Sequence, residues 1–148
     1  MTIPEELITA LVQLGVITLA DIRHAGGLAN IQNPSIDPKD IVIIILDAHA
    51  NLNLLGSTVQ SNAILIETNY THIFHITAVP LEVFVGTFSL ALGVPEATRM
   101  YVVAQAQTLL LNNQLTWFLA NWANSYLPRS RAKVWRTINQ CGARKMRL

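Results

Sequence analysis

The apolar run at residues 41–46, Ile-Val-Ile-Ile-Ile-Leu, constrains the fold of this chain more than any other stretch. Six large aliphatic residues stand between Asp40 and Asp47, and five of the six are β-branched. A run this short, rich in Val and Ile and bounded by turn-forming residues, is typical of a strand buried on both faces. We therefore expect it to form the central strand of a sheet that the rest of the chain covers.

Three later segments extend this predicted sheet to about residue 92. Residues 71–77 and 83–92 alternate between two faces, as strands do, and residues 63–67 form a shorter candidate strand. Gly86 would mark a bend or bulge in the last strand. The connections are too short for parallel crossovers, which favours an antiparallel sheet over residues 40–92.

Helices are predicted on both sides of the sheet. The capping-box spacings Thr2 to Glu5 and Thr18 to Asp21 begin two short helices, which form a helical corner over residues 1–32. Residues 95–141 are predicted to be helical, with a loosening at residues 112–113 and a loose basic tail at 142–148. The expected fold is a single α+β domain over residues 1–148.

The composition indicates a subunit that meets partners. Hydrophobic residues make up 51% of the 148 residues and charged residues 13%, whereas globular chains carry about 25% charged residues. A surface with so little charge leaves apolar patches exposed, and such patches usually contact another molecule. We expect a homo-oligomer or a larger assembly, and a compact monomer with an Asn-, Gln- and Thr-rich surface stays open as the alternative.

Charge is segregated along the chain. The first 96 residues hold all nine acids against two bases, Arg23 and Lys39, a net charge of −7, and the remainder holds eight bases and no acid. Seven of these bases lie in the last 20 residues, and we expect them to contact an oligomer neighbour or nucleic acid: Arg129, Arg131, Lys133, Arg136, Arg144, Lys145 and Arg147. Nucleic-acid binding of this kind would be non-specific and sensitive to salt. A solvated basic end is the third interpretation.

The best candidate for metal chemistry is the segment Asp47-Ala48-His49-Ala50-Asn51. It resembles the Asp-Ala-His-x-Asp metal motif of the arginase-like ureohydrolases over these five residues. That family is excluded because an amide, Asn51, replaces the final acid, the other Asp-rich metal segments are absent and the chain is too short. A site made of Asp47, His49 and either His72 or His75 is a weaker alternative. His72 and His75 cannot both bind the same ion, because they are three positions apart and would point to opposite faces of a strand.

Other chemistries have no recognisable motif. Cys141 is the single cysteine, which excludes an intrachain disulfide and a cysteine metal cluster. No phosphate loop follows the apolar run and no nucleophile elbow occurs. We therefore expect no enzyme activity and no cofactor.

The expected location is the cytoplasm or a virion. The chain has no signal peptide at its start and no apolar segment of about 18 residues that would span a membrane.

Together these features predict a non-catalytic structural subunit of a homo-oligomeric assembly. A virion component such as a phage head, neck or tail protein would have these properties. The alternatives are a small non-specific nucleic-acid-binding protein and, less favoured, a metal-dependent enzyme that uses Asp47 and His49.

Overall fold

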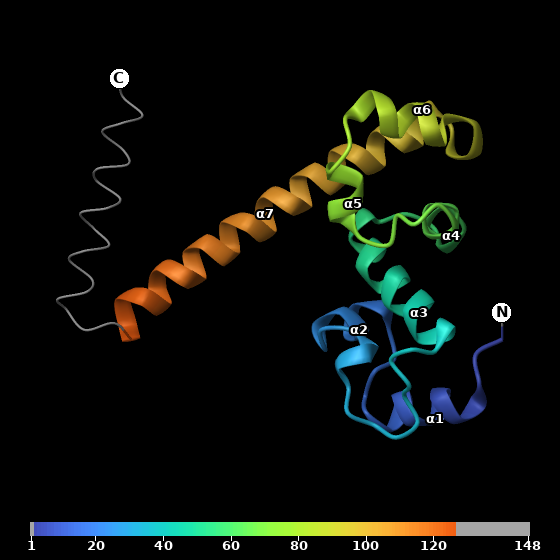
Figure 1. Cartoon of the computed structure of the whole chain (residues 1–148), viewed down its shortest axis with the longest axis vertical. Coiled ribbons are helices and arrows are strands. Elements are labelled where there is room, and N and C mark those ends of the chain that lie inside the picture. The colour runs from blue at the N-terminus through green and yellow to red at the C-terminus, as the bar shows by residue number, and fades with distance from the viewer. Residues whose placement is uncertain (1, 127–148) are drawn as a thin grey trace. The chain divides into compact units, whose positions relative to one another are not determined.

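The computed structural model describes residues 2–126, and these residues are helical with no strand among them (Figure 1). The predicted α+β fold with a sheet at residues 41–92 is therefore wrong, and the described chain is all-α. Its elements follow in order: α1 (Glu5–Gln13), α2 (Leu19–His24), η1 (Leu28–Asn30), α3 (Ile41–Leu52), η2 (Asn53–Leu55), α4 (Val59–Glu67), α5 (Ile73–Thr77), α6 (Leu81–Leu92) and α7 (Val94–Tyr126). The chain divides into two compact units, Met1–Thr108 and Leu109–Leu148.

The apolar run predicted as the central strand forms the first half of α3. Asp40 caps this helix, because its Oδ1 accepts a hydrogen bond of 2.9 Å from the backbone N–H of Val42. Helix α3 contacts α2, η1 and α4 and buries Val42 and Ile43 of the run, whereas Ile41 and Ile44 are exposed. The contacts of α3 with its neighbouring elements outweigh the β preference of its Val and Ile residues.

The other three predicted strands are also helices. Residues 63–67 lie in α4, 71–77 overlap α5, and 83–92 lie in α6, so Gly86 is an interior helical residue rather than a bulge. In α6 the two fully buried side chains are Phe84 and Phe88, and a spacing of four residues fits a helix face as well as an alternating strand face. Periodicity in short apolar segments does not separate these two cases.

The two helices predicted near the N-terminus are present as α1 and α2. The capping box of α2 is confirmed: Thr18 Oγ1 accepts from the N–H of Asp21, and the Asp21 carboxylate accepts from the N–H of Thr18. The predicted capping box of α1 is wrong, because Pro4 is the N-cap and makes no side-chain hydrogen bond. Asp21 also accepts from the Thr18 hydroxyl, and these Thr18 bonds lower the pKa of the Asp21 carboxyl from its ordinary value.

Two groups of side chains form the core of the first unit. The first joins the N-terminal helices to α3 and consists of Leu7, Ile22, Leu28, Ile36, Val42, Ile43 and Ala50. The second is aromatic: Tyr70 and Phe84 lie against Phe88 with ring centroids 5.1 and 4.8 Å away, and Tyr101 lies 5.8 Å from Phe84. The Tyr101 hydroxyl donates to the Val79 carbonyl over 2.7 Å. These contacts hold the start of α7 against α6 (Figure 1).

Helix α7 runs without interruption from Val94 to Tyr126. The sequence correctly predicts helix here, but the loosening predicted at Asn112 and Asn113 is wrong, since both lie inside the helix. The first part of α7 belongs to the first unit and the part from Leu109 belongs to the second.

Candidate interaction surface

The second part of α7 carries large apolar side chains that are exposed. Trp117 is 68% exposed, Phe118 59% and Leu115 57%. The remaining exposed apolar side chains of residues 109–126 are Leu109, Leu110, Leu119 and Trp122. We call this set the α7 surface. Because aromatic side chains each bury roughly 150–250 Å² when they are covered, a surface with this composition is suited to contact with another molecule.

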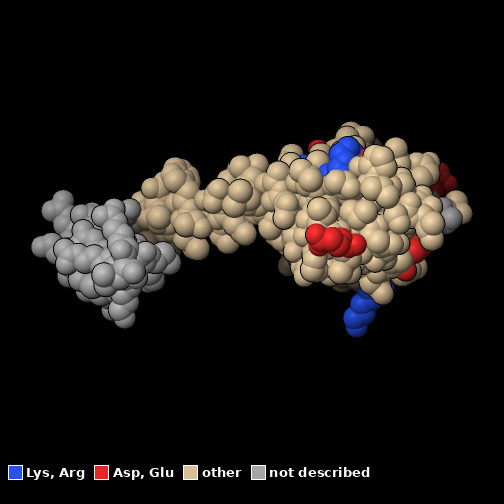
Figure 2. All heavy atoms as spheres, turned by 90° about the horizontal axis from the view of Figure 1, so that it is seen from above, with Lys and Arg blue, Asp and Glu red and all other residues tan. Residues whose placement is uncertain are grey.

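This surface has no charged side chain to keep it in water. From Met100 to Tyr126 the sequence contains no Asp, Glu, Lys, Arg or His. Figure 2 shows the same scarcity of charge, with only scattered red and blue spheres among the tan ones of the described residues. The polar residues that separate the apolar ones are Asn, Gln, Thr and Ser, which are hydrated less strongly than charged groups.

A second apolar feature is a hollow between α1 and α2, with a volume of about 320 Å³. Its lining is aliphatic apart from Thr18, and its rim includes Ile8, Val12 and Ile17, all of them exposed. Deeper in the hollow, Val16 and Leu46 pack against the first core group. We call this feature the α1–α2 hollow.

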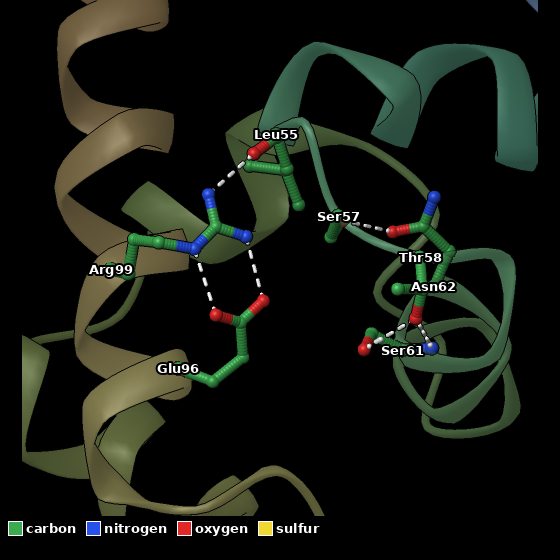
Figure 3. Close-up of polar contacts among 7 residues, drawn as sticks. All are labelled: Leu55, Ser57, Thr58, Ser61, Asn62, Glu96 and Arg99. Carbon is green, nitrogen blue, oxygen red and sulfur yellow. Dashed lines mark hydrogen bonds and ion pairs between the residues drawn. The ribbon is translucent and has the colours of Figure 1, made fainter.

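The polar side chains that the structure brings together hold the fold. Arg99 donates from Nε and Nη2 to the Glu96 carboxylate, over 2.8 and 2.6 Å, and from Nη1 to the Leu55 carbonyl over 2.9 Å (Figure 3). This bidentate pair lowers the pKa of Glu96 and raises that of Arg99. The bonds attach α7 to the end of η2.

The loop beside this pair is fixed by its own polar contacts. Buried Asn62 accepts a hydrogen bond of 2.6 Å from the Ser57 hydroxyl, and Thr58 caps α4 by accepting from the N–H of Ser61 over 3.1 Å (Figure 3). The Glu-x-x-Arg spacing of residues 96–99 and the Thr-x-x-Ser spacing of residues 58–61 are the sequence signals that could have predicted these contacts.

The residues considered for a metal site are placed apart from one another or engaged elsewhere. Both carboxylate oxygens of Asp47 accept backbone N–H groups, from Leu28 over 2.6 Å and from Ala29 over 3.2 Å. His49 lies two residues further along the same helix, and burial lowers its pKa. Among residues 2–126 no group of three or more His, Cys, Asp and Glu side chains is arranged to hold a metal ion.

His72 and His75 lie at the start of α5 instead of on a strand. His72 is the N-cap, and its Nδ1 accepts from the N–H of Phe74 over 3.4 Å. His75 Nδ1 accepts from the N–H of Thr71 over 3.3 Å. Burial lowers the pKa of His72, and the nearby His75 lowers it further. Both imidazoles therefore act in the local hydrogen bonding of this turn.

The basic residues predicted as oligomer or nucleic-acid contacts lie outside the described residues: Arg129, Arg131, Lys133, Arg136, Arg144, Lys145 and Arg147. Cys141 also lies there. The helical spacing of Leu115, Phe118 and Trp122 is a sequence signal for part of the α7 surface, whereas the α1–α2 hollow has no such signal. The hollow depends on how α1 and α2 pack against each other, and the residue spacing within each helix does not reveal this packing.

Within residues 2–126 no single helix is long and apolar enough to span a membrane. Residues Ile41–Leu55 and Val59–Glu67 meet the length and composition criteria only when taken together, and the chain bends by 119° between them.

Comparison with known proteins found no matching family model, no matching curated protein and no matching solved structure.

Proposed function

We propose that this protein is a non-catalytic structural subunit that assembles with further copies of itself through the α7 surface. The observation that carries the proposal is the exposure of Trp117, Phe118 and Leu115 on a stretch of helix that has no charged residue. Exposed aromatic and aliphatic side chains on this scale favour a protein contact, and aromatic residues supply much of the energy of such contacts.

The polar groups of the first unit support the structural part of this proposal. Arg99 and Glu96 attach α7 to η2, and Asp47 accepts backbone N–H groups of η1. These side chains use their hydrogen-bonding capacity to hold helices together.

We propose that the assembly is part of a virion, because a basic segment such as residues 129–147 is suited to contact with packaged nucleic acid.

The proposal is tested by the native mass of the full chain, measured by size-exclusion chromatography with light scattering. We expect a discrete multimer. Replacing Trp117 and Phe118 together by Gln, a good helix former, should reduce the mass to that of a monomer. The matched control is Val102→Gln, because Val102 is also exposed on α7 but lies in the first unit; this variant should keep the wild-type mass.

Two results would contradict the proposal. A wild-type monomer with a raised ratio of absorbance at 260 to 280 nm that falls at high salt would make the protein a nucleic-acid binder. A wild-type monomer that binds phosphatidylcholine vesicles, and loses this binding in the Trp117 and Phe118 variant, would assign the α7 surface to lipid.

A further inference from the structure

We infer that the copies join head to tail, with the α7 surface of one copy packed into the α1–α2 hollow of the next. This inference rests on the self-assembly proposed above and adds the identity of the receiving surface. On α7 the contacting face is the one that carries Leu115, Phe118 and Leu119, because residues at i, i+3 and i+4 share a face.

Shape and chemistry of the two surfaces fit each other. The α7 face is a convex ridge of an aromatic and two aliphatic side chains, and the hollow is a concave aliphatic surface of about 320 Å³. A volume of this size accepts one or two large side chains and not a whole helix. Exposed Ile8, Val12 and Ile17 at its rim would be covered together with the ridge, which removes two apolar surfaces from water at once.

The charge distribution favours this pairing over a symmetric pairing of two α7 helices. The sequence that follows Tyr126 supplies seven bases, whereas residues 100–126 supply no acid that could neutralise them. A contact between two α7 helices would therefore offer no acid to these bases.

No carboxylate lines the hollow itself, but two stand on the helix that forms one of its walls. Exposed Glu5 and Glu6 stand in the first turn of α1, the helix whose Ile8 and Val12 line the hollow. A contact that includes α1 therefore supplies acids to a chain whose last 20 residues supply seven bases, and opposite charges across an interface favour association.

Such a contact joins two different surfaces. Each copy then offers one ridge and one hollow, so the assembly grows as a ring or an open chain instead of stopping at a symmetric dimer.

A mixing experiment with two full-length variants tests this arrangement. In the hollow variant, Val12→Lys puts a charge at the rim of the hollow and leaves α7 intact. In the ridge variant, Leu115→Gln and Phe118→Gln remove the apolar ridge and leave the hollow intact. Each variant alone should be a monomer, with self-association at least about 30-fold weaker than in the wild type. An equimolar mixture should form a heterodimer of one copy of each.

The matched control for the hollow variant is Val59→Lys. Val59 lies on α4, away from the hollow, and is 58% exposed against 60% for Val12, so this variant should keep the wild-type mass. Circular dichroism checks that both variants keep the wild-type helix content. Should Val12→Lys lose helix, Ile17→Lys at the same rim, an even more exposed position, takes its place.

The outcomes separate this inference from the proposed function. A hollow variant that keeps the wild-type multimer would overturn the head-to-tail contact and leave self-assembly standing, as expected if α7 pairs with α7. Two monomeric variants that do not combine would overturn the head-to-tail contact as well. A monomeric wild type would overturn the proposed function itself.

The heterodimer should also dissociate more readily at high salt, and replacing Glu5 and Glu6 by Gln should weaken that salt dependence.

Discussion

The two parts of α7 have the same residue spacing and opposite environments. In the first part Ala97, Tyr101 and Ala104 are buried, and they alternate in steps of four and three residues. The second part continues the same alternation with Leu111, Leu115 and Phe118, yet Leu115 and Phe118 are more than half exposed. A spacing of this kind marks a helix face that packs against a neighbour. In the first part the neighbour is α6 of the same chain, and in the second part we propose that it is another copy.

The comparison shows that an apolar helix face predicts a packing contact but does not tell whether the same chain or another molecule provides it. Tyr101 packs against Phe84 and bonds to the Val79 carbonyl, so the chain itself supplies its partners. Phe118 is equally apolar, and no intrachain burial covers it within the described residues. The predictions below test this difference, from the largest expected effect to the smallest.

Amide hydrogen exchange should separate the two parts most strongly. In dilute protein, where copies are apart, the amides of residues 97–104 should exchange at least about 1,000 times more slowly than those of residues 115–122, because exchange in a packed helix requires unfolding of its core. At high protein concentration the second part should become protected as well. Equal protection of both parts at every concentration would contradict the proposed difference.

Truncation of one phenylalanine in each region should affect the free energy of unfolding differently. Phe84→Ala removes a fully buried ring from the aromatic core group and should cost about 3–5 kcal/mol at any protein concentration. Phe118→Ala should cost less than about 0.5 kcal/mol in dilute protein, with a larger cost only where copies associate. Urea unfolding at two protein concentrations measures both. A concentration-independent loss for Phe118→Ala as large as that for Phe84→Ala would show that Phe118 belongs to an intrachain core.

Two threonines of α7 give a finer version of the same comparison. The Thr108 hydroxyl is buried with no hydrogen-bond partner, whereas the exposed Thr116 hydroxyl donates to the Asn112 carbonyl over 2.9 Å. Thr108→Val keeps the shape and removes the unpaired group, so it should raise the free energy of unfolding by about 1 kcal/mol. Thr116→Val, the control, should change it little. Urea unfolding in dilute protein provides the values, and a destabilised Thr108→Val would mean that its hydroxyl is hydrogen-bonded.

The smallest effect concerns the charge pair at the start of α7. Hydrogen bonds from Arg99 lower the pKa of Glu96 from its ordinary value of 4.5. A carboxyl with a lower pKa in the folded state adds stability above its unfolded pKa, and this is lost as the pH falls through the folded value. Glu96→Gln should therefore cost less than about 1 kcal/mol at pH 7, since the pair is partly exposed.

The same variant should match the wild type in strongly acidic solution, where Glu96 is protonated in both states. Thermal unfolding between pH 7 and pH 2 follows this convergence. A difference that persists at the lowest pH would mean that the side chain acts through packing and not through its charge.

The sequence by itself determined the features that depend on neighbouring residues. The capping box at Thr18 and Asp21 was predictable because both hydrogen bonds close within four residues. The helical C-terminal region and the apolar face at Leu115 and Phe118 were predictable because a long segment shows its period clearly. The low charge and its segregation are properties of composition, and they indicated from the start that the surface would be short of solvating groups.

Only the tertiary structure decided the state of the short apolar segments. Residues 41–46 are as suitable for a strand as for a helix, and the helix is selected by tertiary contacts: α2, η1 and α4 pack on α3 and bury Val42 and Ile43, while Ile41 and Ile44 stay exposed. The α1–α2 hollow was not predictable from sequence, because residues of different helices line it. The bond of Arg99 to the Leu55 carbonyl was not predictable either, because it joins residues 44 positions apart. Burial is a property of the whole arrangement of helices, and a local pattern carries no information about which neighbours supply it.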